Sequence, residues 1–231
     1  MGGDKMPSFW TYITNGKYSV GCTGQTVYVY DKDGNEKARF KDLTYAYCAE
    51  ISPDSKTLAV KTTDGRLAVY SLEKMKLIKK FRFSKVDGGH HEGFCFSADG
   101  SFLFNLESHG DGFERCLALY ETENFNLIRQ LFYGKEMYLS CIEYDAAFDS
   151  YFVIGILYRK FRKNKYFAAE FKDDELKNVT DIKEKEYDFY NKFKDLEKSG
   201  FTKKKYRWSY MDESLEELSS QKLKISDLIK R

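Results

Sequence analysis

The sequence is poor in proline and has no long apolar run. Two of its 231 residues are proline, and no stretch approaches the roughly 20 apolar residues that a membrane-spanning helix needs. The N-terminal MGGDKMPSFW also lacks the apolar core of a secretory signal peptide. These absences predict a cytoplasmic protein that has no membrane partner.

An excess of charge of one sign is missing as well. The 38 Lys and Arg residues nearly balance the 36 Asp and Glu residues, which leaves a formal net charge of +2. No overall field therefore attracts nucleic acid or an anionic surface. The runs 159–166 and 203–208 interleave cations with aromatic residues, as nucleic-acid proteins do, but a hairpin tip and a basic loop explain them more simply. Nucleic acid is not an expected partner.

Signatures of metal binding and of catalysis are also absent. No CxxC pair exists, and an odd number of widely spaced cysteines predicts reduced thiols that pack as small apolar side chains. The five cysteines are Cys22, Cys48, Cys95, Cys116 and Cys141. The chain has no GxSxG, P-loop, HExxH or complete EF-hand motif. We therefore predict no catalytic residue, no cofactor and no enzymatic activity.

What the sequence does contain is an internal repeat. A turn cluster between two apolar runs occurs four times, and the units start 38, 45 and 48 residues apart. These clusters lie at 13–21, 51–60, 96–105 and 144–155. A second landmark follows each of them and aligns Tyr30, Tyr70, Tyr120 and Glu170. A third closes the first three units at Phe40, Phe81 and Phe132. A period of 40 to 50 residues is typical of repeat folds.

Each unit is predicted to hold four strands. In the second unit they are expected at 46–52, 57–62, 66–71 and 76–83, separated by turns that contain Pro, Asp and Gly. Loops this short cannot make the crossover that parallel strands need. The sheets must therefore be antiparallel, and the fold class is all-β.

The repeated pattern resembles the WD-repeat β-propeller family. The third strand of that family commonly ends in Trp-Asp; here Tyr30-Asp31 keeps the acid, and Tyr70-Ser71 and Tyr120-Glu121 are degenerate versions. The resemblance covers about residues 9 to 172. It implies a propeller domain at 8–180 with four recognisable blades and a charged, partly helical C-terminal extension at 181–231. The blades are expected at about 8–43, 44–84, 90–133 and 138–180.

Four blades are fewer than the roughly seven that this family usually closes into a ring. The chain could form a small ring, an open crescent completed by a second copy as a homodimer, or a partial ring that another chain completes, because exposed sheet edges invite aggregation. The spacing of apolar residues predicts amphipathic helices at 189–201 and 211–231. The second helix could pack on the propeller or on a partner. If it packs on the propeller, its deletion should lower solubility or melting temperature.

All three histidines fall in the third unit, in the segments 87–93 and 107–114. Three alternatives stay open for them: a buried hydrogen-bond network, exposed loop residues that contact a partner, and a metal site. In the WD-repeat family a Gly-His before the inner strand pairs with an Asp of a later turn, and Gly89-His90 or His91 with Asp111 resembles that pair. The network and loop interpretations are favoured, and no metal ligand is assigned.

The predicted function is a non-catalytic scaffold that presents propeller loops to a protein or peptide partner. Rigid sheets hold such loops in place at little cost in ordering. Two alternatives remain, a propeller hydrolase or lyase with a site in the central channel and an assembly subunit whose open ring another chain completes. The predicted partner-binding residues lie on one presumed face. They are His90, His91, Glu92, His109, Asp111, Asp64 and Arg66.

Overall fold

The computed structural model describes most of the chain and is built almost entirely from antiparallel strands. The described residues are 7, 9, 11–85, 93–109, 114–133, 136–158, 163–187, 193–198, 202–209, 214–219 and 224–229. Four sheets have four strands each, in simple sequential order, and a fifth has three. The all-β fold class and the antiparallel pairing predicted from the repeat are therefore confirmed.

The strand bounds follow the predicted units closely. The first sheet contains β1 Thr11–Thr14, β2 Tyr18–Cys22, β3 Val27–Asp31 and β4 Glu36–Phe40. The second contains β5 Ala46–Ile51, β6 Thr57–Thr62, β7 Arg66–Ser71 and β8 Lys76–Arg82. The third contains β9 Phe94–Phe96, β10 Phe102–His109, β11 Glu114–Glu121 and β12 Leu127–Leu131. The fourth contains β13 Met137–Asp145, β14 Ser150–Leu157, β15 Lys165–Lys172 and β16 Glu175–Ile182.

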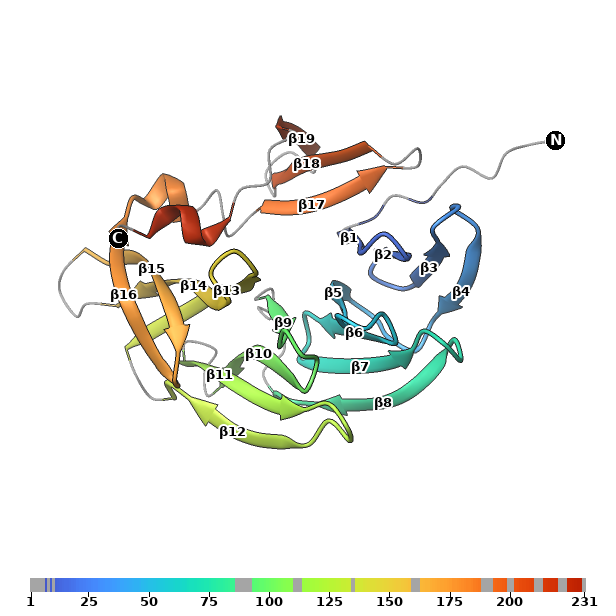
Figure 1. Cartoon of the computed structure of the whole chain (residues 1–231), viewed down its shortest axis with the longest axis horizontal. Helices are drawn as coiled ribbons and strands as arrows, with labels where there is room; N and C mark the ends of the chain where they lie inside the picture. The colour runs from blue at the N-terminus through green and yellow to red at the C-terminus, as the bar shows by residue number, and fades with distance from the viewer. Residues whose placement is uncertain are drawn as a thin grey trace.

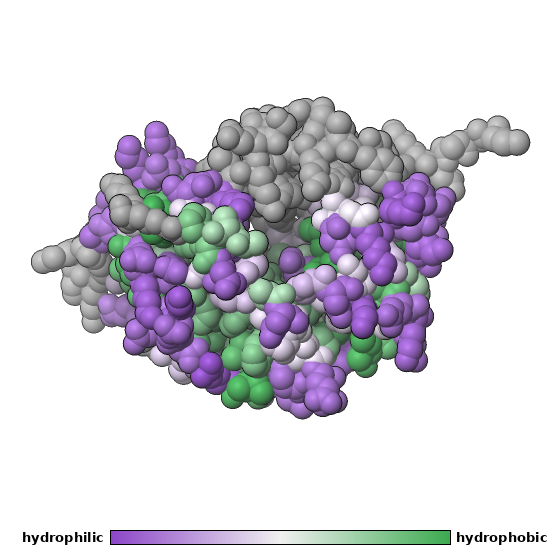
Figure 2. Space-filling model, viewed as in Figure 1, coloured by the Kyte–Doolittle hydropathy of each residue, from purple (hydrophilic) through white to green (hydrophobic). Residues whose placement is uncertain are grey.

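The sheets are arranged as the blades of a propeller. Figure 1 shows β1, β5, β9 and β13 nearest the middle of the ring and β4, β8, β12 and β16 at its outer edge. Each gap between neighbouring blades is filled by an apolar core. Val60 and Tyr70 help to fill the first gap, Val69 and Phe96 the second, and Leu139 the third. On the face shown in Figure 2, hydrophilic residues cover much of the rim.

The landmark of the third strand coincides with a shared irregularity. In all four blades the pairing of the third and fourth strands shifts register beside Tyr30, Tyr70, Tyr120 or Glu170. A bulge of this kind bends a strand and increases its twist. The aligned residues of the sequence therefore mark one structural position.

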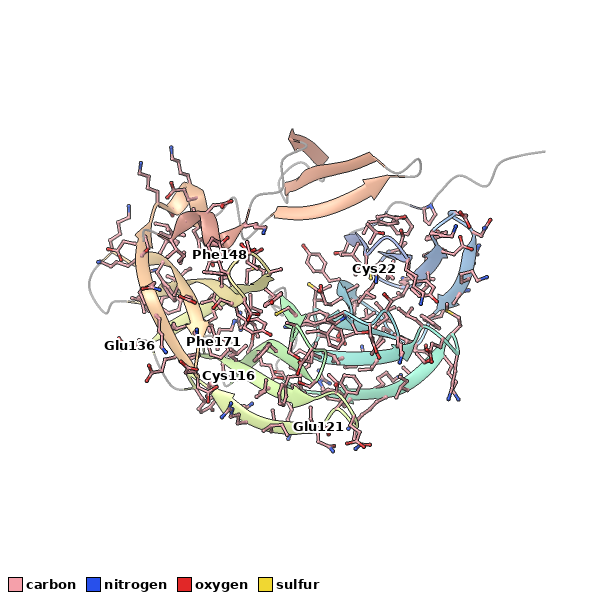
Figure 3. The ribbon with its side chains drawn as sticks, viewed as in Figure 1. Cys22, Cys116, Glu121, Glu136, Phe148 and Phe171 are labelled. Carbon is pink, nitrogen blue, oxygen red and sulfur yellow. The ribbon has the colours of Figure 1, made fainter. Side chains whose placement is uncertain are left out.

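The polar residue after this landmark caps the following turn. Asp31 Oδ1 accepts the N–H groups of Asp33 and Asn35 at 3.0 and 2.9 Å. In the third blade Glu121, labelled at the lower edge of Figure 3, accepts two turn N–H groups in the same way. In these two blades the acid therefore satisfies backbone groups of the turn that follows it.

The C-terminal segment differs from the prediction. We expected helices at 189–201 and 211–231 and a basic loop at 203–208, but the structure has strands within these segments, and a 3-10 helix at 225–228 within the second of them. The strands are β17 Phe193–Lys198, β18 Thr202–Ser209 and β19 Ser214–Ser219. The register sets Asp195 opposite Lys205 and Glu197 opposite Lys203.

This fifth sheet lies next to the first blade, where β17 contacts β1. Figure 1 shows it between the first and fourth blades. The helical part of the extension is limited, among the described residues, to 184–187 and the 3-10 helix η1 Ile225–Leu228. None of the described helices has both the length and the apolar character to cross a lipid bilayer.

None of the five cysteines forms a disulfide, as predicted, and three of them are buried. Figure 3 shows Cys22 and Cys116 within their sheets. Burial raises the pKa of the Cys116 thiol to about 12. These cysteines therefore act as small apolar side chains in the blades.

Candidate functional site

The turns that follow the inner strands share one hydrogen-bonded design. Ser52 Oγ donates to Asp54 Oδ1 at 2.7 Å and accepts the N–H of Thr57 at 2.9 Å. In the next blade Ser97 Oγ donates to Asp99 at 2.6 Å and accepts the N–H of Phe102 at 2.8 Å. Such a turn satisfies several of its polar groups internally, which restricts its shape.

Hydrogen bonds also fix the charge of the turn acid. The Ser97 hydroxyl and the N–H and hydroxyl of Ser101 all bond to Asp99, and they lower its pKa to about 2. Asp99 is therefore ionised throughout the neutral range and takes no part in proton transfer there.

The fourth blade departs from this design. The position of Ser52 and Ser97 is occupied by Asp145, which is 1% exposed. Asp145 Oδ1 accepts Lys224 Nζ, and Oδ2 accepts Ser226 Oγ, both at 2.5 Å. A carboxylate thus replaces the hydroxyl, and it binds the C-terminal segment while its Oδ1 also accepts the N–H of Ala147 in its own turn at 3.0 Å.

Apolar contacts support this attachment. Ile225 and Ile229 are buried against Phe152 and Ile154 of β14, and the N–H of Ile225 donates to Glu143 Oε1. The segment 224–229 is therefore part of the folded domain, which agrees with the intramolecular alternative of the sequence analysis for this part of the tail.

A pocket of about 510 Å³ lies between the ends of the inner strands. Its walls come from β5, β9 and β13, from the turns that follow them, and from the C-terminal segment. The lining residues are Glu50, Ile51, Pro53, Phe94, Cys95, Phe96, Ser97, Ala98, Ile142, Glu143, Tyr144, Ala146 and Lys224. Figure 1 shows the three inner strands around the middle of the ring. The pocket therefore lies at the central channel.

Equivalent positions of the repeat supply the polar groups of the pocket. One aligned position near the end of each of these inner strands lines the pocket. It is occupied by Glu50 in blade two, Cys95 in blade three and Glu143 in blade four. Burial, followed by the nearby carboxylates and the Cys141 thiol, raises the pKa of the Cys95 thiol well above its ordinary value. Cys95 is therefore a neutral thiol at pH 7 and a weak nucleophile.

The predicted residues Asp64 and Arg66 occupy the opposite end of the second blade. Their side chains form an ion pair across the β6–β7 turn, and Arg66 Nη2 also donates to Thr44 Oγ1 at 2.9 Å. Thr62 Oγ1 donates to Asp64 Oδ1 at 2.5 Å. Burial raises the pKa of Asp64, but the bonds from Arg66 and Thr62 outweigh it and keep that pKa below its ordinary value.

The structure describes only one of the remaining predicted site residues, and that one only by its backbone. His90, His91, Glu92 and Asp111 lie outside the described residues, and His109 is placed by its backbone as the last residue of β10. Their role in partner binding stays a prediction. Within the described ranges, no three His, Cys, Asp or Glu side chains come together as metal ligands.

The pocket was missed by the sequence analysis, which placed the site at the other end of the blades. Consecutive turns of an antiparallel sheet alternate between its two ends, so the β5–β6 turn and the β6–β7 turn lie on opposite faces. The available signal was that two inner strands carry a charged residue, Glu50 or Glu143, at the same aligned position. An acid on an inner strand differs from the apolar pattern that the repeat otherwise keeps.

Comparison with known proteins supports the fold. The chain is similar to a hydrazine synthase of Kuenenia stuttgartiensis, with a TM-score of 0.55 and 17% identity over 72% of this chain and 51% of the other. It is also similar to the WD40 domain of a Toxoplasma gondii coronin, with a TM-score of 0.53 and 16% identity over 72% of this chain and 43% of that one. No protein-family model and no curated protein matches the sequence.

The chain spans about half the length of these two structures. At such low identity the similarity shows the propeller fold alone, and propellers carry unrelated activities. Four four-stranded antiparallel sheets and a WD40 neighbour agree with the resemblance found in the repeats. The function must be argued from the pocket.

Proposed function

We propose that this protein is a non-catalytic interaction scaffold that binds a protein or peptide partner at the channel pocket. The observation that carries this proposal is a cavity of about 510 Å³ framed by turns that satisfy their own hydrogen bonds. A preformed site of this kind loses little conformational entropy when it binds. Propeller folds offer several such turns side by side.

The chemistry of the pocket supports binding over catalysis. The Cys95 thiol has a raised pKa and is a poor nucleophile. Glu143 accepts the N–H of Ile225 and Asp145 binds Lys224 and Ser226, so these carboxylates hold the C-terminal segment. A general base needs a carboxylate directed at a substrate proton. The groups therefore fit structural and recognition roles.

The proposal can be tested by filling the pocket. Ala98 is exposed in the turn after β9 and lines the pocket, so Ala98→Trp should block the entrance without disturbing the core. Pull-downs from the lysate of the source organism would compare the intact protein, Ala98→Trp and the matched control Glu123→Trp, which alters an exposed turn at the outer strands. Each variant must first show an intact melting transition.

We expect a reproducible partner to be captured by the intact protein and the control, and lost with Ala98→Trp. A double variant His91→Ala, Asp111→Ala tests the face predicted from the sequence. If capture is lost only in that double variant, the binding surface is at the other end of the blades and the pocket proposal is wrong.

A further inference from the structure

The C-terminal segment 224–229 is held like a docked peptide and not as a strand of the ring. It belongs to none of the described sheets, and its internal backbone bonds close a short 3-10 turn, in which the N–H of Asp227 donates to the carbonyl of Lys224 at 3.1 Å. Figure 1 shows this red segment beside β14 and β15, and both strands contact it. Its attachment therefore resembles the binding of a short peptide to a surface groove.

The bound segment defines what this surface of the fourth blade recognises. Asp145 is 1% exposed and accepts the Lys224 ammonium with one oxygen and the Ser226 hydroxyl with the other, both at 2.5 Å. Ile225 and Ile229, four positions apart, are buried against β14. A buried carboxylate is costly without a cation and hydrogen-bond donors, so a peptide that replaces the tail must supply the same groups. The surface thus fits a cation, an apolar residue and a hydroxyl residue in succession, with a second apolar residue four positions after the first.

This docking surface is continuous with the channel pocket. Lys224 lines the pocket, and the residues that follow it pack on β14. The end of β13 takes part in both sites, because Tyr144 and Ala146 line the pocket while Asp145 between them holds the tail. A cavity of about 510 Å³ has the size of a small-molecule site, so a bound peptide extends beyond it. A peptide that extends along the end of β13 meets the tail and has to displace it.

We propose that the segment 224–229 is an internal competitor of the partner peptide. The partner peptide passes from the pocket onto the fourth blade, displaces the tail, and binds Asp145 with a lysine or arginine that an apolar residue follows. This inference rests on the proposed function, because it names the ligand chemistry and the regulation of the same site. The tethered tail has an effective concentration of about a millimolar, so it excludes peptides that lack the matching groups. Partner binding and tail docking oppose each other, and this coupling is reciprocal.

The probe is a fluorescein-labelled peptide with the sequence of residues 223–231. Fluorescence anisotropy measures its binding to the unaltered full chain and to the full-length double variant Ile225→Ala, Ile229→Ala, whose tail has lost its apolar contacts. We expect this variant to bind the peptide at least about tenfold more tightly, which corresponds to about 1.4 kcal/mol, because its own tail competes less. The matched control Ile78→Ala, Ile128→Ala removes two exposed isoleucines of the outer strands and should bind as the unaltered chain does. Melting curves must show that both variants are folded.

Two further measurements test the role of Asp145 and the displacement itself. A probe peptide with Lys224→Glu should not bind, and adding Asp145→Asn to the tail variant should weaken binding of the original peptide at least about tenfold. In the unaltered chain carrying 13C-methyl isoleucine, millimolar unlabelled peptide should move the Ile225 methyl signal to the position of a released tail. An unchanged Ile225 signal, or a tail variant that binds no better than its control, overturns the inference.

The two proposals fail in different ways. We expect the partner that Ala98→Trp loses to be captured more strongly by Ile225→Ala, Ile229→Ala and to be released by the peptide, whereas a purely structural tail predicts equal or weaker capture. If the peptide leaves that partner in place, the partner uses the pocket alone, and the inference is wrong while the scaffold proposal stands. If the peptide displaces the tail but no captured partner depends on Ala98, the proposed function is wrong and the competitor role falls with it.

Discussion

Glu107 is the centre of a buried polar cluster in the third blade. It is 1% exposed, and its carboxylate accepts the Tyr120 hydroxyl at 2.6 Å and the Asn105 amide at 2.9 Å. Burial, together with the Glu107 charge and hydrogen bond, raises the pKa of Tyr120. Tyr120, the landmark residue of the third strand, therefore brings a hydrogen bond as well as a ring.

Removing that hydroxyl should destabilise the protein. Tyr120→Phe leaves a buried carboxylate with one donor fewer, and we expect a loss of about 2 kcal/mol, or a melting temperature lower by about 4 to 8 °C. Thermal unfolding followed by circular dichroism measures the effect. Tyr133→Phe, at a tyrosine that is 54% exposed, is the control and should change little. A stable Tyr120→Phe variant would show that the hydroxyl contributes no net stability.

At the scale of elements, the attachment of the C-terminal segment depends on the charge of Asp145. Burial raises the pKa of this carboxyl, but the bonds from Lys224 and Ser226 outweigh it, so the pKa lies below its ordinary value of about 3.9. A lowered carboxyl pKa stabilises the folded state above the unfolded value, and this stability is lost as the pH falls through the folded value. The attachment should therefore be intact at neutral pH and weaken below about pH 4.

This pH dependence can be followed at Ile225, whose side chain is 1% exposed. Its methyl NMR signal should move with a midpoint below about pH 4, as the segment leaves the fourth blade. Asp145→Asn should lack this transition and show a partly released segment at pH 7. The control Asp174→Asn alters an exposed ion pair with Arg129 and should titrate like the unaltered chain. The same transition in Asp145→Asn would contradict the assignment.

The elements of the repeat were largely predictable from the sequence. The strands expected at 57–62 and 66–71 match β6 and β7, and those at 46–52 and 76–83 are one residue too long. Alternating apolar residues and turn residues act locally, so a single sequence carries this information. The bond between Lys224 and Asp145 joins residues 79 positions apart, and no local pattern reports such a contact.

The C-terminal strands could not be predicted for a related reason. In the segment 189–201, both the spacing of the apolar residues and the charged residues between them are compatible with a helix. The strands that form there pair β17 with β18 in a hairpin and place β17 against β1 of the first blade, and such pairing overrides local propensity. The pocket was out of reach because its walls combine three blades and the tail.

At the scale of the whole molecule, the tail covers an apolar face of the fourth blade. Removing 224–231 should expose Phe152 and Ile154 and cost about 3 kcal/mol, because two isoleucine side chains lose their buried contacts. Calorimetry should show a lower melting temperature, and the solubility of the truncated chain should fall. A chain that lacks only 230–231 is the control. Identical melting curves for both truncations would mean that the tail adds no stability to the ring.

The aspartate in the fourth turn also has a mechanical consequence. Because Asp145, Glu143 and β14 hold 224–229, a pulling force applied beyond this segment is borne first by a clasp of one ion pair, one hydroxyl bond, one backbone bond and two isoleucines. The strands of the ring are loaded only after that clasp opens. The exchange of serine for aspartate at one repeat position thus gives the propeller a weak link that yields before its blades do.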